Sequence, residues 1–173
     1  WRGIFAMKMI AAVDRNWGIG YKGELLTRIS SDLKNFKTLT IGGTVILGRK
    51  TIEGFPGARP LPGRKNIVLS RNKELDIEGA MVVHSIEELK EVLAGQESDK
   101  VFVIGGASVY EQLLQYCDGA VITKIDEEFI ADAYLPVLDD MDRWKMVDES
   151  EEYEEKGHRF KFCTYVNNNP ENL

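Results

Sequence analysis

Six short apolar segments, separated by helical or loop segments, constrain the fold of this chain more than any other feature. They lie at residues 9–13, 44–47, 66–69, 80–83, 101–104 and 120–123. Several are continuously apolar, which is typical of parallel strands that are covered on both faces. Between them, a capping-box pattern at residues 85–88 predicts a helix to about Leu93, and a second helix is expected from after Gly105-Gly106 to about Tyr116. This alternation predicts an α/β fold with a predominantly parallel central sheet and flanking helices.

The C-terminal part of the chain has a different pattern. Residues 144–150 and 158–166 resemble two strands joined by the acidic segment 151–156, so we expect an antiparallel hairpin that completes a sheet of about eight strands. No repeat or linker divides the 173 residues, which suit a single domain. Residues 1–6 are expected to be a native extension or a cloning remnant, and residues 167–173 a polar tail.

Composition excludes several classes of function. A net charge of −6 argues against a general nucleic-acid or membrane-surface binder, and no apolar run is long enough to span a membrane. Two cysteines, Cys117 and Cys163, fit a reducing compartment, so we expect a cytoplasmic location. His84 and His158 lack the spacing of metal ligands, so no metal site is predicted, and no context for nucleophilic catalysis stands out.

One acidic residue lies on an apolar stripe. If residues 29–39 form a helix, Asp32 shares a face with Leu33, Phe36 and Leu39. A carboxylate on such a face needs partners and usually has a shifted pKa. Asp32 is therefore either a catalytic group or a carboxylate that stabilises the helix N-terminus. Desolvation would raise its pKa and hydrogen bonds would lower it, and the sequence does not decide between them.

Glycine and basic residues follow several of the predicted strands. Gly105-Gly106 lies between a strand and a helix, where it serves either close approach to a phosphate or tight helix packing. Arg49-Lys50-Thr51 and Ser70-Arg71 follow two strands whose ends would share one sheet edge. They form either a phosphomonoester site or solvated surface charge. Arg64 follows a Pro-rich turn, where it can clamp a carboxylate or cap the turn.

Together these segments resemble the dihydrofolate reductase family from Met9 to about Val166. The ordered matches are Ala11-Ala12-Val13, Gly18-Ile19-Gly20, Asp32-Leu33 with Phe36-Lys37, residues 45–51, residues 59–69, residues 103–110 and Thr123-Lys124-Ile125-Asp126. The resemblance implies an enzyme that reduces dihydrofolate to tetrahydrofolate by hydride transfer from NADPH to C6. It implies dihydrofolate and antifolate inhibitors as ligands, and we expect a monomer with no nucleic-acid or membrane partner.

The resemblance also implies roles for individual residues. Asp32 would promote protonation of pterin N5, Thr123 would hydrogen-bond its carboxylate, and Arg64 would clamp the glutamate tail. The implied substrate-binding residues are Ile10, Ala12, Leu33, Phe36, Leu61, Arg64, Ile104 and Tyr110. The implied NADPH-binding residues are Ala12, Ile19, Gly20, Gly48, Arg49, Lys50, Thr51, Leu69, Ser70, Arg71, Gly105, Gly106, Ala107, Ser108, Val109 and Tyr110. The family has a cis peptide at the position of Gly105-Gly106.

The sequence departs from the family pattern near the active-site loop. Leu26 and Thr27 replace the usual Pro-Trp, and Ser30 stands where proline is common. The Thr27 hydroxyl is expected to order a water near the pterin in place of the tryptophan, so Thr27 joins Asp32 and Thr123 as a catalytic candidate. Ala131 stands where glycine is frequent, while Asp132 can still hold the loop. Two alternatives stay open: a pyrimidine reductase of riboflavin synthesis on the same fold, and a nucleotide-binding homologue without activity.

Overall fold

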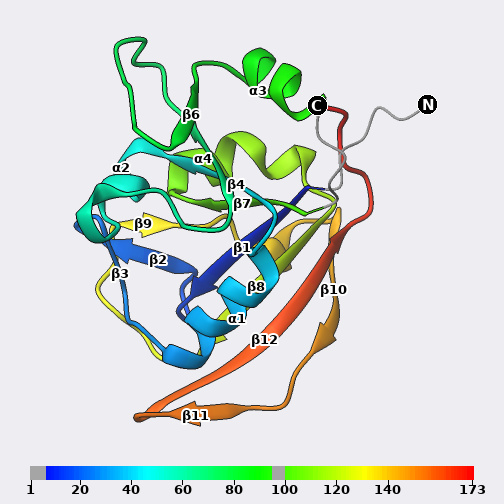
Figure 1. Ribbon diagram of the computed structural model, residues 1–173. Helices are drawn as coiled ribbons and strands as arrows, with labels where there is room; N and C mark the ends of the chain where they lie inside the picture. The colour runs from blue at the N-terminus through cyan, green and yellow to red at the C-terminus, as the bar shows by residue number, and fades with distance from the viewer. Residues whose placement is uncertain (1–6, 95–99) are drawn as a thin grey trace.

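A computed structural model describes residues 7–94 and 100–173 of the chain (Figure 1). The predictions for residues 1–6 lie outside this described part. The central sheet has the strand order β10-β12-β8-β1-β7-β4-β5-β6, and β11 pairs with β12 beside this path. Its parallel strands are β1 (Met7–Val13), β4 (Thr44–Gly48), β5 (Lys65–Leu69), β6 (Ala80–Val83), β7 (Val101–Gly105) and β8 (Gly119–Ile125). The predicted α/β fold is confirmed, because each of the six apolar segments forms one of these strands.

The parallel strands are apolar because both faces of the sheet are covered. In β4 the residues from Thr44 to Leu47 are all buried, and in β5 the same holds from Asn66 to Leu69. Because neither face of these strands is exposed to solvent, buried residues do not alternate with exposed ones, and the strands form the centre of the core. The main apolar cluster extends from Met9 and Val103 to Leu113 and Trp144.

Helices lie at the three predicted places, and a short helix that was not predicted follows β4. They are α1 (Ser30–Thr40), α2 (Arg49–Glu53), α3 (Ile86–Ala94) and α4 (Ala107–Leu113). The Ser85 hydroxyl accepts a hydrogen bond from the Glu88 amide, as the capping-box pattern predicts. Helix α4 is shorter than predicted, because a 3-10 turn, Leu114–Tyr116, replaces its last part. None of the helices in residues 7–94 and 100–173 is long and apolar enough to cross a membrane.

The C-terminal hairpin contains one strand more than predicted. Strands β10 (Trp144–Glu149) and β12 (His158–Asn167) pair antiparallel, as expected. The connecting segment also contains β11 (Tyr153–Glu155), which pairs with β12 through a turn at Lys156 and Gly157. Both turn residues have positive φ, 51° and 84°, which is the geometry of a tight hairpin turn. A strand of three residues with two glutamates has too weak a pattern to be recognised from the sequence.

A small second sheet was not predicted. It has the order β3-β2-β9 and consists of β2 (Gly18–Tyr21), β3 (Glu24–Leu25) and β9 (Ala133–Tyr134). Strands β2 and β3 are joined at Lys22 and Gly23, which also both have positive φ. These strands are too short for an alternation of apolar and polar residues to be detected in the sequence. The sheet nevertheless gives the segment between β1 and α1 a defined path.

The last residues of the chain pack against the domain. Asn167 belongs to β12, and its side-chain amide donates a hydrogen bond to the Cys117 carbonyl at 2.9 Å. Leu173 is buried with the main apolar cluster.

Candidate active site

The parallel register brings the predicted site segments to one edge of the sheet. Gly48 at the end of β4 is paired with Leu69 at the end of β5, and Leu47 is paired with Gly105 at the end of β7. The segments that follow these strands therefore begin side by side (Figure 1). The carboxyl edge of such a sheet, where the strand order reverses, is where α/β proteins bind ligands.

Asp32 lies in the first turn of α1 and faces β8. The Thr123 hydroxyl donates a hydrogen bond to Asp32 Oδ1 at 2.5 Å, and Thr123 itself is buried. Burial raises the pKa of the Asp32 carboxyl, while the hydrogen bond from Thr123 opposes this shift with a smaller effect. The sequence left this question open, and the structure answers it: desolvation outweighs the hydrogen bond.

Strand β1 extends this site next to Thr123. Ala12 is the register partner of Thr123, and Ile10 shares its side of β1 two residues earlier. The Tyr110 hydroxyl donates to the Ile10 carbonyl at 2.6 Å, and burial raises the pKa of the Tyr110 phenol far above its ordinary value. Tyr110 therefore keeps its proton and ties α4 to β1. Asp32, Thr123, Ala12, Ile10 and Tyr110 form one continuous group of contacts.

Apolar side chains of α1 lie beside this group. Phe36 and Leu39 are half-buried, whereas Leu33 is 38% exposed. Leu61 and Ile104 are also half-buried and both pack on the apolar cluster around Val45, Leu47 and Val68. These residues can supply the walls of a pocket for a flat aromatic ring, because they are apolar but not completely covered.

Arg64 is held at the far end of α1. Its Nη1 donates to Thr40 Oγ1 at 3.1 Å and its Nε donates to the Pro62 carbonyl at 3.0 Å, while burial lowers the pKa of the guanidinium. The turn before Arg64 is fixed by Asn66, whose amide bonds both the N–H and the C=O of Leu61 at 2.9 Å. Sequence reasoning missed Asn66, although a polar residue opening an apolar strand was the available signal.

Glycines form a tight cradle where β4 and β7 end. The peptide between Gly105 and Gly106 is cis, as the resemblance implies, and Gly105 has a φ of +136°. A Cβ atom on Gly106 would lie 3.2 Å from Thr51 Oγ1, and a Cβ atom on Gly48 would lie 3.2 Å from Val109 Cγ2. Ala107 is half-buried and Ser108 exposed, whereas Val109 is buried in the core. A side chain would be strained at Gly105 and crowded at Gly48 and Gly106, so glycines here favour a close approach of a ligand to the backbone.

The predicted basic cluster lies at the ends of β4 and β5. Arg49 Nη1 pairs with Glu53 Oε1 at 2.8 Å, and Lys50 and Arg71 are exposed. The Ser70 hydroxyl accepts a hydrogen bond from the Asn72 amide at 3.2 Å. His84, which sequence reasoning had left without a role, follows β6 at the same edge, and its Nδ1 lies 2.9 Å from the Ser70 carbonyl oxygen.

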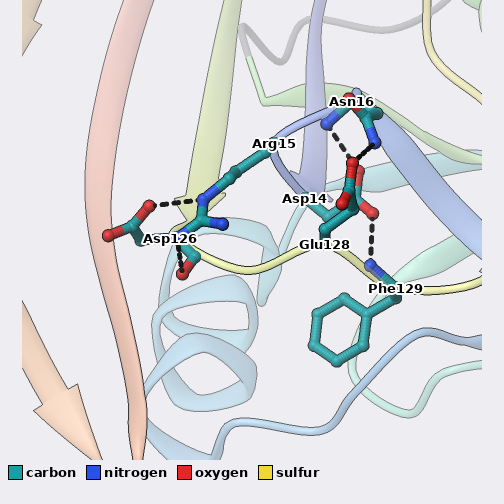
Figure 2. Close-up of polar contacts among 6 residues, drawn as sticks. All are labelled: Asp14, Arg15, Asn16, Asp126, Glu128 and Phe129. Atoms are coloured by element: carbon teal, nitrogen blue, oxygen red, sulfur yellow. Dashed lines mark hydrogen bonds and ion pairs between the residues drawn. The ribbon is translucent and has the colours of Figure 1, made fainter.

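The segment between β1 and α1 is anchored by two aspartates. Asp14 is buried and accepts hydrogen bonds from the amides of Asn16, Gly18 and Phe129 at 2.8–3.0 Å. Figure 2 shows those from Asn16 and Phe129. Asp132 accepts a hydrogen bond from the Lys22 amide at 3.0 Å, which supports its expected role in holding the loop. Sequence reasoning missed Asp14. Ile19 and Gly20 lie in this segment, on β2, and both are half-buried.

Thr27 lies next to a histidine. Its hydroxyl oxygen is 3.4 Å from Nε2 of His158, the first residue of β12. The other ring nitrogen of His158 contacts the Glu127 carboxylate. No sequence pattern connects these residues, because they come from three distant segments.

Two surface depressions lie elsewhere on the described part of the chain. One of about 420 Å³ is lined by Trp17, Lys124, Glu149 and neighbouring residues, and another of about 310 Å³ lies along β8 and β12. Neither is lined by a residue predicted to bind substrate or cofactor. The candidate site is therefore identified by the chemistry of the Asp32 region and not by these depressions.

The comparisons with known proteins agree on one family. A family model described as dihydrofolate reductase matches residues 6–167. The dihydrofolate reductase of Bacillus subtilis (strain 168) is 36% identical over 165 residues, which are 94% of this chain and 95% of that protein. The dihydrofolate reductase of Neisseria meningitidis serogroup B is 36% identical over 159 residues, 91% of this chain and 96% of that protein. A solved structure of dihydrofolate reductase from Enterococcus faecalis, complexed with NADP(H) and RAB-propyl, has a TM-score of 0.85 and 35% identity, with 98% of this chain and 99% of that one covered.

Proposed function

This chain belongs to the dihydrofolate reductase family, and on that premise we propose that it reduces dihydrofolate to tetrahydrofolate with NADPH. The observation that carries the proposal is the buried Asp32 carboxylate, bonded to Thr123 beside the β1 residues Ile10 and Ala12. It is an acid–base group on an apolar wall, as reduction of a pterin ring requires. Full-length relatives with the same activity support it.

The residues at the carboxyl edge suit the cofactor. NADPH, when bound, supplies the hydride that C6 of the pterin receives. Gly105 and Gly106 would lie against its diphosphate and nicotinamide side, since they leave backbone N–H groups uncovered. Lys50, Ser70 and Arg71 would hold the phosphate on its adenosine ribose through charge-assisted hydrogen bonds.

Asp32 would promote the protonation of pterin N5 that the reduction also requires. N5 of the pterin gains this proton when C6 gains the hydride. The Asp32 carboxylate would pair with the pterin ring and, in a water-poor site, stabilise the positive charge that develops there. Because burial raises the pKa of this carboxyl, it holds a proton up to a higher pH than an exposed aspartate does.

Thr27 and Arg64 would orient the reactants at the two ends of α1. The Thr27 hydroxyl would hold a water near N5, in place of the indole that the family usually has there. Arg64 would bind the α-carboxylate of the glutamate tail, because Thr40 holds its Nη1 and the Pro62 carbonyl holds its Nε, which directs the Nη2 end of the guanidinium to an anion. Antifolates would occupy the same pocket as the pterin.

The alternatives are less well supported. A pyrimidine reductase of riboflavin synthesis has to hold a ribose phosphate, whereas Arg64 lies at the end of α1, in the position of a folate-tail clamp. An inactive homologue would explain the altered Leu26-Thr27 segment, but Asp32 and Thr123 keep their contact.

We also propose one reductase domain that works as a monomer in the cytoplasm. Cys117 and Cys163 are free and buried, which suits a reducing compartment. Light scattering after size-exclusion chromatography tests the monomer against the chain mass of 19.5 kDa.

NADPH oxidation by the purified protein, measured with dihydrofolate and with a no-substrate blank, tests the proposed reaction. Rapid turnover that methotrexate-type antifolates inhibit would support it. NADPH binding without turnover of dihydrofolate would contradict it and would direct attention to the phosphoribosyl pyrimidine substrate.

A further inference from the structure

We infer that the turn of the β11–β12 hairpin is a clamp for the segment from Thr27 to Asp32, with Glu155 and His158 as its two positioning residues. This inference rests on the proposed function, since the clamped segment carries the carboxylate to which we assign catalysis. The clamped segment contains Thr27 and Ser30, two residues that depart from the family pattern, and the β11–β12 hairpin that contacts it is distant in the sequence.

The hairpin geometry places both residues on the same side. Glu155 and His158 are register partners at the ends of β11 and β12, joined only by Lys156 and Gly157. The positive φ of both turn residues keeps the turn tight. Directly paired residues of an antiparallel hairpin point their side chains to the same face. Glu155 and His158 therefore reach the Thr27–Asp32 segment together.

Glu155 supplies the N-terminal cap that α1 lacks. Ile29 at the N-cap position provides no side-chain hydrogen bond to the helix. The Ser31 amide instead donates to both carboxylate oxygens of Glu155, at 3.3 and 3.4 Å, and the Ser31 hydroxyl also donates to this carboxylate. These contacts lower the pKa of the Glu155 carboxyl, with the Ser31 hydroxyl as the largest cause. The Ser30 amide also acts on the Glu155 carboxylate, and a proline at position 30 would have no N–H for this contact.

His158 orients the Thr27 hydroxyl. A carboxylate only accepts hydrogen bonds, so the tautomer that satisfies the contact with Glu127 has its ring proton on Nδ1. Nε2 is then an acceptor, and the Thr27 hydroxyl, 3.4 Å away, donates to it. This arrangement leaves the lone pairs of the Thr27 oxygen free to accept from a water or a ligand.

An apolar contact holds the segment between the two polar ones. Ile29 is 3% exposed and packs with Ile125 of β8 and Phe160 of β12, and Ala12 packs against the same cluster. Asp32 follows Ser31 directly and is itself bonded to β8 through Thr123. Movement of the first turn of α1 would change the position of the Asp32 carboxylate, and a misplacement of about 1 Å can cost up to about 100-fold in rate.

The Glu155 contact is tested with Glu155→Ala and Glu155→Gln, with Glu151→Gln as control. Glu151 is an exposed glutamate of the same connecting segment and lies outside β11. We measure kcat for dihydrofolate at saturating NADPH and amide hydrogen exchange over residues 30–37. Glu155→Ala should lower kcat about tenfold and speed exchange in the first turn of α1. Glu155→Gln, which keeps one acceptor oxygen, should lie between it and the wild type, and Glu151→Gln should match the wild type.

Unchanged exchange in Glu155→Ala would overturn the clamp, whatever happens to kcat. Faster exchange with unchanged kcat would overturn the positioning role. If the wild-type protein does not reduce dihydrofolate at all, the exchange measurement still tests the contact, so a failure of the proposed function is distinguishable from a failure of the clamp.

The His158 contact is tested by a double-mutant cycle. Thr27→Val and His158→Gln should each lower kcat about threefold to tenfold. The kcat of the double variant should be only slightly lower than that of the more impaired single variant. Fold-changes that multiply would show that the two residues act independently and would overturn this part of the clamp.

Discussion

At the residue scale, the chemistry of Asp32 depends on two opposing effects. Burial disfavours its charged form, and the hydrogen bond from Thr123 favours it. Burial is the stronger effect, so the pKa of the carboxyl is raised. A charged group is thus kept at a cost in stability, as is common for functional groups.

The first prediction concerns activity. Asp32→Asn keeps the shape and an acceptor for Thr123 but cannot ionise, so turnover at neutral pH should fall by about 100-fold or more. Partial recovery at low pH is expected, because the substrate is then protonated before it binds. Full activity of this variant at pH 7 would contradict the role of Asp32.

The second prediction concerns stability of the same variant. Because the folded-state pKa of Asp32 is above its unfolded value, the folded protein loses stability as pH rises from the unfolded pKa through the folded one. Asp32→Asn lacks this penalty, so its Tm should exceed that of the wild type at pH 7. The difference should shrink below the ordinary pKa of aspartate, about 3.9. Thermal unfolding between pH 3 and 8 measures it, and a difference independent of pH would argue against desolvation as the cause.

The third prediction concerns Arg64. Arg64→Ala should raise KM for dihydrofolate about tenfold to 100-fold with little change in kcat, because a charge-assisted contact to the tail is lost. Dihydropteroate, which lacks the glutamate tail, serves as the matched control substrate. Its KM should be the same for both proteins, and an equal rise with both substrates would show that Arg64 supports the turn instead.

At the scale of elements, the residues that follow neighbouring parallel strands would determine the preference for NADPH over NADH. The register of β4 with β5 places Arg49 and Ser70 in adjacent segments, so residues from two separate parts of the sequence act as one cluster. Arg49 is partly neutralised by Glu53, which leaves Arg71 as the exposed guanidinium of the cluster.

The fourth prediction follows from this cluster. The wild type should prefer NADPH to NADH, and Arg71→Ala should reduce that preference about tenfold or more by raising KM for NADPH alone. Lys90→Ala, which removes an exposed cation on α3, should leave the preference unchanged. Equal catalytic efficiency of the wild type with both cofactors would refute the phosphate role.

At the scale of the whole molecule, the segment between β1 and α1 depends on distant contacts. Asp14 bonds this segment to the amide of Phe129, which follows β8, and β9 pairs with β2 in the small sheet. Three backbone donors converge on one buried side chain. Its removal leaves buried N–H groups without acceptors, which is expensive.

The fifth prediction concerns this anchor. Asp14→Ala should lower the free energy of unfolding by about 2–3 kcal/mol and Tm by about 5–10 °C. Arg15→Ala is the control, since it removes a neighbouring exposed ion pair with Asp126 and should change Tm little (Figure 2). Thermal unfolding at pH 7 measures both, and equal effects would contradict the special role of Asp14.

The linear pattern of the chain was enough to predict the central sheet, because a strand covered on both faces consists mostly of apolar residues, as residues 45–47 of β4, 67–69 of β5 and 101–104 of β7 do. It also indicated Asp32, since a carboxylate on an apolar stripe is visible in a linear pattern, and the family resemblance supplied Thr123 as its partner. The cis peptide at Gly105-Gly106 was likewise implied by the resemblance.

How the active-site segment is held depends on contacts that form only in the folded chain. Asp14, Glu155 and His158 act on residues from distant segments, and no local period records such contacts. The folded structure also sets the direction of the Asp32 pKa shift, because desolvation depends on how many atoms from other elements surround a group. Local patterns report which face of an element is covered, whereas contacts between distant segments depend on how those elements meet in three dimensions.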